Sequence, residues 1–379
     1  MSSSDKIKDN VPCPQIISEA QSISKRNHQG IPGFEILPSD RMFATYYAND
    51  YAGEGPGNYA ILAVCPPHGE WHEIQVILPP AEDLRVFDPS LWLAPDGALW
   101  WCFNLSYTTE ENKIYDGRGG VFGCVCREPD CDTPVWEKPV FIGDGVMMNK
   151  PTVLADGSWA FPCAVWDAYP ELMSDELKEI SGANFCITSD GGKKFKFVQG
   201  PNVPERGFDE HTLIEKNNGD WWCCVRTSYG IGESFSSDGG LTWSEGSDSK
   251  LGTICSRFAM QRLKSGKLIL VTHLASFRMP GEKKCSSEGR KNLTVYLSDD
   301  DGKSWYGALC IDCRNNISYP DIAEGNDGFI YCIYDRERLK LGQILLSRFT
   351  ESDIKAGEML TPGAYSMKLI SSFDAVRKN

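Results

Sequence analysis

Residues 236–243 read SSDGGLTW and residues 298–305 read SDDDGKSW, so both segments fit the pattern Ser-x-Asp-x-Gly-x-(Thr/Ser)-Trp. Asp and Gly favour a tight turn between antiparallel strands, and an Asp side chain can bond the backbone of its own turn. The closing Trp supplies a large apolar surface that can anchor the hairpin on its sheet. Residues 188–195, TSDGGKKF, keep the turn and have Phe in place of Trp. We expect these segments to be structural turns without a chemical role.

A second signal, a polar turn followed by apolar residues, occurs six times along the chain. The six turns are marked by Asp40, Asp96, Asp156, Asn218, Ser265 and Asp327. Successive turns lie 56, 60, 62, 47 and 62 residues apart, which leaves room for four short strands in each interval. Runs rich in β-branched and aromatic residues, such as 59–64 (YAILAV) and 292–297 (NLTVYL), lie between the turns. The repeats therefore predict an all-β fold, a six-bladed β-propeller.

The chain has 379 residues, which is long for a single domain. A propeller closes only when all its blades are present, so the repeats indicate one domain over residues 26–379. Residues 1–25 are polar, and we interpret them as an N-terminal segment without a secretory signal. No apolar run approaches the length of a membrane span. We therefore expect a soluble, cytoplasmic protein.

The number and positions of the cysteines also favour the cytoplasm. There are fifteen of them, an odd number, and several occupy apparent strand interiors, namely Cys102, Cys223, Cys224 and Cys332. Buried free thiols in a reducing cytoplasm account for this pattern better than a disulfide framework does. We see no metal-binding motif, and we expect no metal and no cofactor.

The formal net charge of −14 restricts the partners. A strongly acidic protein is poorly suited to nucleic acid or to an anionic membrane surface. The negative net charge of the protein also repels an acidic substrate at long range. Such a substrate must therefore be held by arginines placed locally in the site. The sequence gives no indication of the oligomeric state.

The segments at 236–243 and 298–305 resemble the Asp box of the sialidase superfamily, and the resemblance extends from about residue 28 to about residue 350. Glu210 and Arg226, sixteen residues apart, match a family pair separated by a strand, a turn and a second strand. The resemblance implies that Glu210 assists a tyrosine nucleophile and that Arg226 holds the sugar carboxylate. The pairing is chemically reasonable, because a phenol with a pKa near 10 is a weak nucleophile unless a neighbouring carboxylate accepts its proton.

Three further positions extend the resemblance. Arg290 precedes the strand that leads into the second Asp box, and it resembles the last arginine of the carboxylate-binding triad. Tyr319 lies in the segment SYPDI (residues 318–322), which resembles the motif of the catalytic tyrosine. Asp335 stands where the family has a carboxylate that steadies an active-site arginine. The resemblance thus implies that Tyr319 is the nucleophile and Asp335 a positioning group.

In the family, an Asp on the loop after the first inner strand is the acid/base catalyst. Here that loop, residues 46–59, reads YYANDYAGEGPGNY. Glu54 is the matching carboxylate by its distance from the strand, and Asp50 is the alternative. The glycines beside Glu54 suit a loop that places a carboxylate over a channel, although a solvated loop glutamate would have the same pattern.

The chain departs from the family at one important position. Sialidases open with Arg-Ile-Pro, whose arginine is the first of the triad, whereas residues 30–32 read GIP. Gly30 therefore removes a charge-assisted contact of the kind worth roughly 1.5–3 kcal/mol. Either Arg257, Arg336 or Lys150 supplies a replacement charge, or the acidic group is held differently and the substrate is not sialic acid.

Other polar residues at the starts of inner strands are candidate cavity liners. They are Asp88, Asn149, Lys150 and His211. The alternative is that these side chains cap backbone groups where the strands begin.

The leading functional hypothesis is a sialidase-like exo-glycosidase that acts on a terminal acidic sugar, either a sialic acid, another ulosonic acid or a uronate-containing glycan. By the resemblance, Glu54 protonates the leaving oxygen while Tyr319, assisted by Glu210, attacks the anomeric carbon. Arg226 and Arg290 anchor the carboxylate. A tyrosine nucleophile predicts retention of configuration.

Two alternatives remain open. The first is a propeller polysaccharide lyase or rhamnosidase-type enzyme that acts at a uronate, with His28 beside the altered position 30 as its base. The second is a non-catalytic propeller that binds carbohydrate, since Asp boxes also occur in binding modules.

Overall fold

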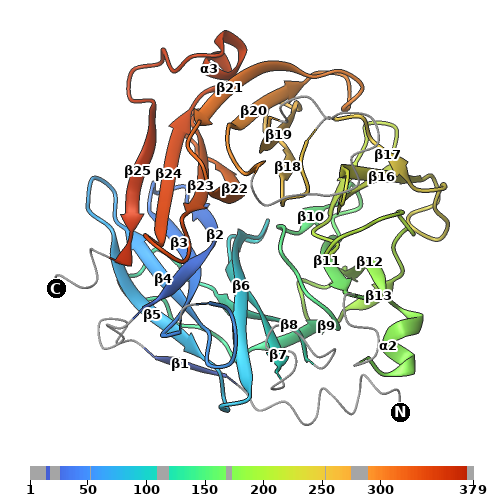
Figure 1. Cartoon of the computed structure of the whole chain (residues 1–379), viewed down its shortest axis with the longest axis horizontal. Coiled ribbons are helices and arrows are strands. Elements are labelled where there is room, and N and C mark those ends of the chain that lie inside the picture. The colour runs from blue at the N-terminus through green and yellow to red at the C-terminus, as the bar shows by residue number, and fades with distance from the viewer. Residues whose placement is uncertain are drawn as a thin grey trace.

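The chain folds into six antiparallel sheets arranged around a central channel, as the blades of a propeller (Figure 1). The computed structural model describes residues 14–17, 26–51, 53–108, 119–167, 173–251, 253–274 and 289–373. Within each blade, four strands follow one another in chain order from the channel outward. The prediction of an all-β, six-bladed propeller is confirmed.

The first two blades consist of β2 (His28–Ile36), β3 (Met42–Asn49), β4 (Tyr59–Cys65) and β5 (His72–Leu78), then β6 (Leu84–Leu93), β7 (Leu99–Tyr107), β8 (Gly119–Cys126) and β9 (Val140–Gly143). The third and fourth consist of β10 (Thr152–Val153), β11 (Trp159–Val165), β12 (Gly182–Thr188) and β13 (Lys196–Val198), then β14 (Thr212–Glu215), β15 (Trp221–Thr227), β16 (Gly230–Ser236) and β17 (Ser247–Asp248). The last two consist of β18 (Ala259–Arg262), β19 (Leu268–His273), β20 (Leu293–Ser298) and β21 (Tyr306–Asp312), then β22 (Ile317–Glu324), β23 (Ile330–Arg336), β24 (Gln343–Phe349) and β25 (Tyr365–Ser371).

The six repeated turns all have the same structural position. Each of them joins the innermost strand of a blade to the second strand, as the turn at Asp96 does between β6 and β7. Gly97 in that turn has φ 85°, a conformation that glycine adopts without steric cost. The sequence interval between successive turns therefore equals the length of chain in one blade.

The Asp boxes form the expected turns between the third and fourth strands. In the box after β16, Asp238 Oδ1 accepts hydrogen bonds from the Thr242 backbone N–H (2.9 Å) and from the Ser236 hydroxyl (2.8 Å). The Trp243 ring lies 6.0 Å from the ring of Phe185 in the preceding blade. Each box thus closes its own hairpin, and this one also packs one blade against its neighbour.

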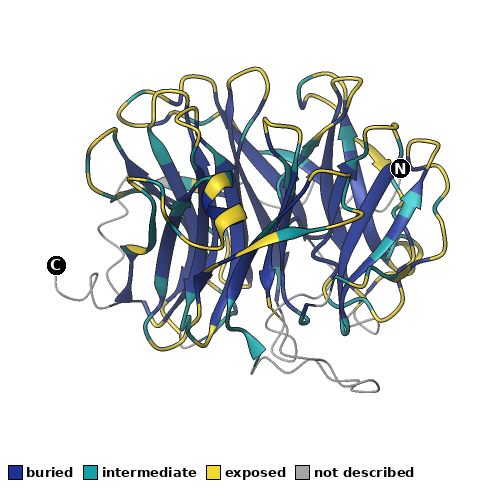
Figure 2. Cartoon of the chain, turned by 90° about the horizontal axis from the view of Figure 1, so that it is seen from above, coloured by how far each residue is buried: buried dark blue, intermediate teal, exposed yellow. Residues whose placement is uncertain are grey.

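The apolar core lies between successive blades. Tryptophans of the sequence repeats fill it, since Trp92, Trp100 and Trp159 pack together between the second and third blades. The ring closes between the first and last blades, where Phe34 stacks on Tyr331 with ring centroids 5.6 Å apart. Figure 2 shows that the strands are largely buried, whereas the exposed residues gather in the turns.

Some features were not indicated by the sequence. Within the segment interpreted as a polar N-terminal extension, β1 (Gln15–Ile17) pairs with β5 and adds a fifth strand to the first blade. The helix α3 (Glu351–Ala356), which follows β24, was likewise not indicated. By contrast, α2 (Asp175–Glu179), between β11 and β12, lies in a stretch, residues 170–180, whose charged residues favour a short surface helix. In the described residues, no helix is long and apolar enough to span a membrane.

The cysteines predicted to be buried thiols, Cys102, Cys223, Cys224 and Cys332, are buried and form no disulfide. Two further cysteines, Cys310 and Cys313, are exposed and also unpaired.

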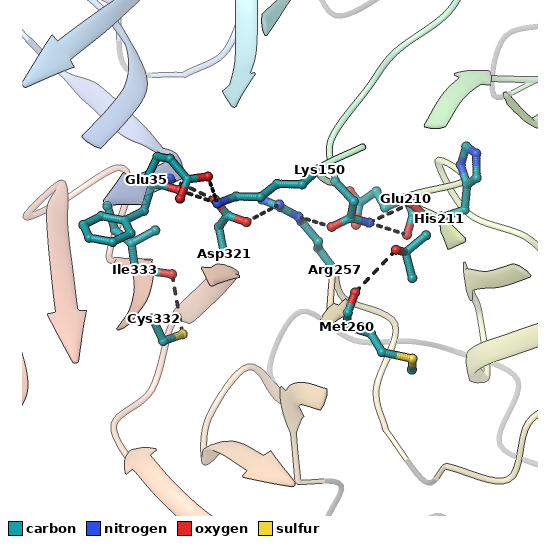
Figure 3. A network of polar contacts seen from close by, with 12 residues as sticks. Glu35, Lys150, Glu210, His211, Arg257, Met260, Asp321, Cys332 and Ile333 are labelled. Atoms are coloured by element: carbon teal, nitrogen blue, oxygen red, sulfur yellow. Dashed lines mark hydrogen bonds and ion pairs between the residues drawn. The ribbon is translucent and has the colours of Figure 1, made fainter. Parts of the chain in front are cut away.

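Charged side chains from several blades meet across the channel (Figure 3). Lys150 Nζ donates to Glu35 Oε2 (2.9 Å) and lies 3.7 Å from Asp321 Oδ2. Asp321 Oδ2 also accepts the backbone N–H of Phe34 (2.8 Å), and its Oδ1 lies 3.9 Å from Arg257 Nη2. We call Glu35, Lys150, Arg257 and Asp321, together with Asn149, the channel network.

The channel network borders a cavity of about 440 Å³ at the mouth where the inner strands end. Glu35 and Lys150 line this cavity together with Leu154, Glu215 and Glu324. The residues at the starts of the inner strands lie at the other mouth. Lys150 thus belongs to the network and to the cavity beyond it.

Removal of the central carboxylate should destabilise the fold. In Asp321→Ala, Phe34 N–H loses its acceptor and both Lys150 and Arg257 lose a buried counter-charge, so we expect the free energy of unfolding to fall by about 3–5 kcal/mol. Guanidinium denaturation measures this change. As a control, exposed Asp132→Ala should change it by less than about 0.5 kcal/mol. Equal effects of the two substitutions would contradict a structural role of the network.

Candidate active site

Three of the inner strands begin with the same backbone irregularity. Ile31, Asp88 and Tyr319 have φ values of 52°, 43° and 56°, and each is followed by a proline. The pairing register with the second strand shifts at each of these points. Left-handed non-glycine residues are costly and gather at functional sites. The bulges therefore mark one mouth of the channel as the candidate site.

The predicted pair Glu210 and Arg226 is in direct contact. Arg226 Nη1 donates to Glu210 Oε1 at 2.6 Å, and the two residues are 6% and 3% exposed, respectively. The strand register explains the contact. Thr212 of β14 lies opposite Cys224 of β15, and the strands are antiparallel, so two residues further along this pairing position 210 comes opposite position 226. Glu210 Oε2 is buried and has no hydrogen-bond partner among the described residues. One carboxylate oxygen thus remains available to a neighbour.

Guanidinium groups surround the side chain of Tyr319. Arg290 Cζ lies 5.2 Å and Arg338 Cζ 4.8 Å from the centroid of its ring. Burial and the charge of Glu210 raise the pKa of Tyr319, while Arg290, Arg226 and Arg338 act in the opposite direction. The phenol is therefore neutral at pH 7, with an acidic and several basic groups close to it.

Glu54 belongs to the same cluster. Its carboxylate lies 3.3 Å from Arg85 Nη1 and 3.4 Å from Arg338 Nη1, and its side chain is 28% exposed. Burial acts to raise the pKa of Glu54, but Arg85, Arg338 and His28 outweigh it and leave the pKa below its ordinary value. Asp50, the alternative carboxylate of this loop, is exposed. The structure therefore brings Glu54 into the cluster.

His28 and Asp88 are buried near Glu54. Burial lowers the pKa of His28 to about 4, so its imidazole is neutral at pH 7. Burial, reinforced by the charge of Glu54, raises the pKa of Asp88 to about 8. Asp88 Oδ1 has no hydrogen-bond partner within the described part of the chain. These residues form a compact group of titratable side chains.

The residues considered as replacements for the missing arginine lie elsewhere. Lys150 and Arg257 belong to the channel network, where Arg257 Nε also donates to Asn149 Oδ1 at 3.0 Å. Arg336 donates to Gln343 Oε1 at 3.0 Å. The ring nitrogens of His211 lie 2.8 and 2.7 Å from the backbone carbonyl oxygens of Asp209 and Asn184, so its one N–H donates to the backbone, which is the capping role considered for it.

Arg338 was missed by the sequence reasoning. Its Nε lies 3.7 Å from Asp335 Oδ2, and Asp335 is fully buried. Asp335 also accepts the Ser318 hydroxyl (2.7 Å) and the Ile31 backbone N–H (2.8 Å). The only available signal was the sequence interval of three residues between Asp335 and Arg338, which no motif singles out.

The fold is a six-bladed propeller of the sialidase type. A model of the BNR repeat-like domain matches residues 61–332, so the chain belongs to this family. No similar sequence was found among curated proteins.

Solved structures share the fold at low sequence identity. The intramolecular trans-sialidase of Ruminococcus gnavus, solved with oseltamivir carboxylate, is 13% identical with a TM-score of 0.64, over 90% of this chain and 98% of that one. The leech intramolecular trans-sialidase is also 13% identical with a TM-score of 0.64, over 92% and 71%. A Dyadobacter fermentans protein of unknown function is 13% identical with a TM-score of 0.59, over 86% and 95%.

The raised pKa of Asp88 predicts a pH-dependent stability. Between the ordinary value of 3.8 and about 8, the folded protein binds more protons than the unfolded chain, so this contribution to stability is lost as the pH rises. Asp88→Asn removes the titration. Its free energy of unfolding should therefore fall less than that of the wild type between about pH 5 and about pH 9. Denaturant titrations at both pH values test this, and Asp132→Asn should behave as the wild type does.

Proposed function

We propose that the protein is a retaining exo-glycosidase that acts on a terminal acidic sugar. The observation that supports this best is the arrangement around Tyr319, where Arg290 and Arg338 face the ring and the buried pair of Glu210 and Arg226 lies close enough to influence its ionisation. A phenol beside both a proton acceptor and several guanidinium groups suits attack on a sugar that carries a carboxylate.

In the first step, Tyr319 Oη forms a bond to the anomeric carbon and transfers its proton to Glu210. The bond from this carbon to the leaving oxygen breaks, and protonated Glu54 gives that oxygen its proton. In the second step, Glu54 takes a proton from water, and the water oxygen attacks the anomeric carbon. Tyr319 then leaves and recovers its proton from Glu210. Each step inverts the carbon once, so the product retains the configuration.

The buried charges of the site suit an anionic substrate. Arg226 and Arg290 are the proposed anchors of the carboxylate, as charge-assisted hydrogen bonds from guanidinium to carboxylate are strong and directional. Asp88 and His28 are proposed to line the same pocket because both lie near Glu54. A local concentration of arginines would overcome the long-range repulsion from a protein of net charge −14.

One observation keeps the lyase alternative in consideration. Burial holds His28 neutral at pH 7, and a neutral imidazole is the form that can remove a proton from a uronate. In that case His28→Ala would abolish activity and Glu54→Gln would be harmless. An unsaturated product that absorbs in the near ultraviolet identifies elimination.

Tyr319→Phe should lower kcat by about a hundredfold or more, because the nucleophile is lost together with the proton that Glu210 accepts. The wild type incubated with a fluorinated acidic sugar should gain its mass as a covalent adduct, and Tyr319→Phe should not. Tyr331→Phe, in the same blade, serves as the control. Full activity of Tyr319→Phe, or a product of inverted configuration by NMR, would exclude this nucleophile.

A substrate screen tests the function as a whole. The panel contains sialosides, glycosides of other ulosonic acids and uronate-linked rhamnosides, and the products are identified by mass spectrometry. The mass of the product also separates hydrolysis from intramolecular transfer, the activity named for two proteins of the same fold. Binding of acidic sugars without turnover across the whole panel would indicate a carbohydrate-binding propeller.

A further inference from the structure

The space at position 30 is occupied by another residue. A Cβ atom built on Gly30 would lie 2.5 Å from Arg338 Cγ, closer still to Arg338 Cδ, and 2.8 Å from Asp335 Oδ2. The φ of Gly30 is not in the left-handed region, so its backbone would accept another residue. Gly30 is therefore required by the side chain of Arg338 and not by the backbone.

The backbone holds Arg338 in this place. The loop after β23 turns tightly at Glu337, whose carbonyl accepts the N–H groups of Lys340, Leu341 and Gly342, each at 2.9 Å. The carbonyl of Arg338 accepts the N–H of Gln29, the residue before Gly30, at 3.2 Å. The loop of the last blade is thus fastened to the first inner strand, and the aliphatic part of Arg338 crosses over Gly30.

The guanidinium of Arg338 lies among the proposed catalytic groups. It lies over the ring of Tyr319, its Nε is 3.7 Å from Asp335, and its Nη1 is 3.4 Å from Glu54. With a side chain 22% exposed, it remains accessible to a ligand in the mouth. Arg290 and Arg226 approach the same phenol from the fifth and fourth blades.

We propose that Arg338 is the third carboxylate-binding arginine of this site, inserted from the last blade into the space that Gly30 leaves open. Its contact with Glu54 is exchanged for the sugar carboxylate when substrate binds. This inference rests on the proposed function, because it assumes an acidic sugar at Tyr319. In this proposal Arg338 selects substrates that carry a carboxylate, and Gly30 leaves the space that the Arg338 side chain needs.

The exchange has a consequence for Glu54. In the sugar-free protein Glu54 faces Arg85, Arg338, His28, Tyr47 and Asp88, and the two arginines keep its pKa low although burial acts in the opposite direction. A bound carboxylate takes up the charge of Arg338 and adds a negative charge, so the pKa of Glu54 rises. Glu54 then takes up a proton and can act as the acid. Binding of an acidic sugar is thereby coupled to proton uptake.

Two probes test the assignment: a 2,3-unsaturated sialic acid and its uncharged carboxamide. The wild type should prefer the acid, and Arg338→Ala should reduce this preference about ten- to a hundredfold, the loss expected for one charge-assisted contact. Calorimetry in buffers of different ionisation enthalpy should show less proton uptake for Arg338→Ala than for the wild type. Arg348→Ala, an arginine paired with Asp327 by a 2.7 Å contact, is the control and should match the wild type.

Moving the arginine from position 338 to position 30 should restore the affinity for the acid probe. Gly30→Arg alone should bind the acid weakly, because the new side chain meets Arg338. The double variant Gly30→Arg/Arg338→Ala should recover at least about tenfold of the affinity that Arg338→Ala loses. Thermal unfolding of each variant separates loss of binding from loss of folding.

The outcomes distinguish this inference from the proposed function. If the wild type turns over acidic sugars while Arg338→Ala keeps the full preference for the acid over the carboxamide, the role of Arg338 is wrong and the proposed function stands. If the wild type neither binds the acid probe nor turns over any member of the panel, the proposed function fails and the role of Arg338 fails with it.

Discussion

The compensation of buried charge is the constraint on which this site depends. Arg226 and Arg85 are buried and Arg338 is partly buried at the mouth of the channel, and an uncompensated buried ion costs several kcal/mol. Their carboxylates come from other strands or other blades, as Glu210 does for Arg226 and Glu54 for both Arg85 and Arg338. Such pairs fix the relative positions of the blades at the mouth, and the cluster can be ordered before any ligand arrives.

The same compensation bears on how acid/base groups can function here. Glu54 lies between two arginines, which hold it in its ionised form. The negative charge of Glu54, together with burial, keeps nearby Asp88 neutral to about pH 8. Neighbouring carboxyl groups with separated pKa values are typical of sites that move protons. The binding of an anionic ligand would change the pKa values of Glu54 and Asp88 together, because both carboxyl groups respond to the charges around Glu54.

The sequence predicted those parts of the structure that follow from spacing along the chain. The turns at Asp96 and its counterparts gave the six blades, and the interval between Glu210 and Arg226 is fixed by strand register, so their contact could be expected. Arg338 could not be found in this way. Its side chain reaches position 30 through space from the opposite end of the sequence, and only the three-dimensional structure shows that the volume above Gly30 is filled.

The position of Arg338 connects the site to the closure of the ring. The first and last blades meet through the stacking of Phe34 on Tyr331, and near the mouth through Asp335, which accepts the N–H of Ile31. Arg338 lies on this seam, since its carbonyl accepts the N–H of Gln29. In a propeller with an arginine at position 30, that group would belong to the first blade itself. Here the guanidinium reaches its place only when the two ends of the chain have joined, so a complete set of arginines around Tyr319 requires a closed propeller.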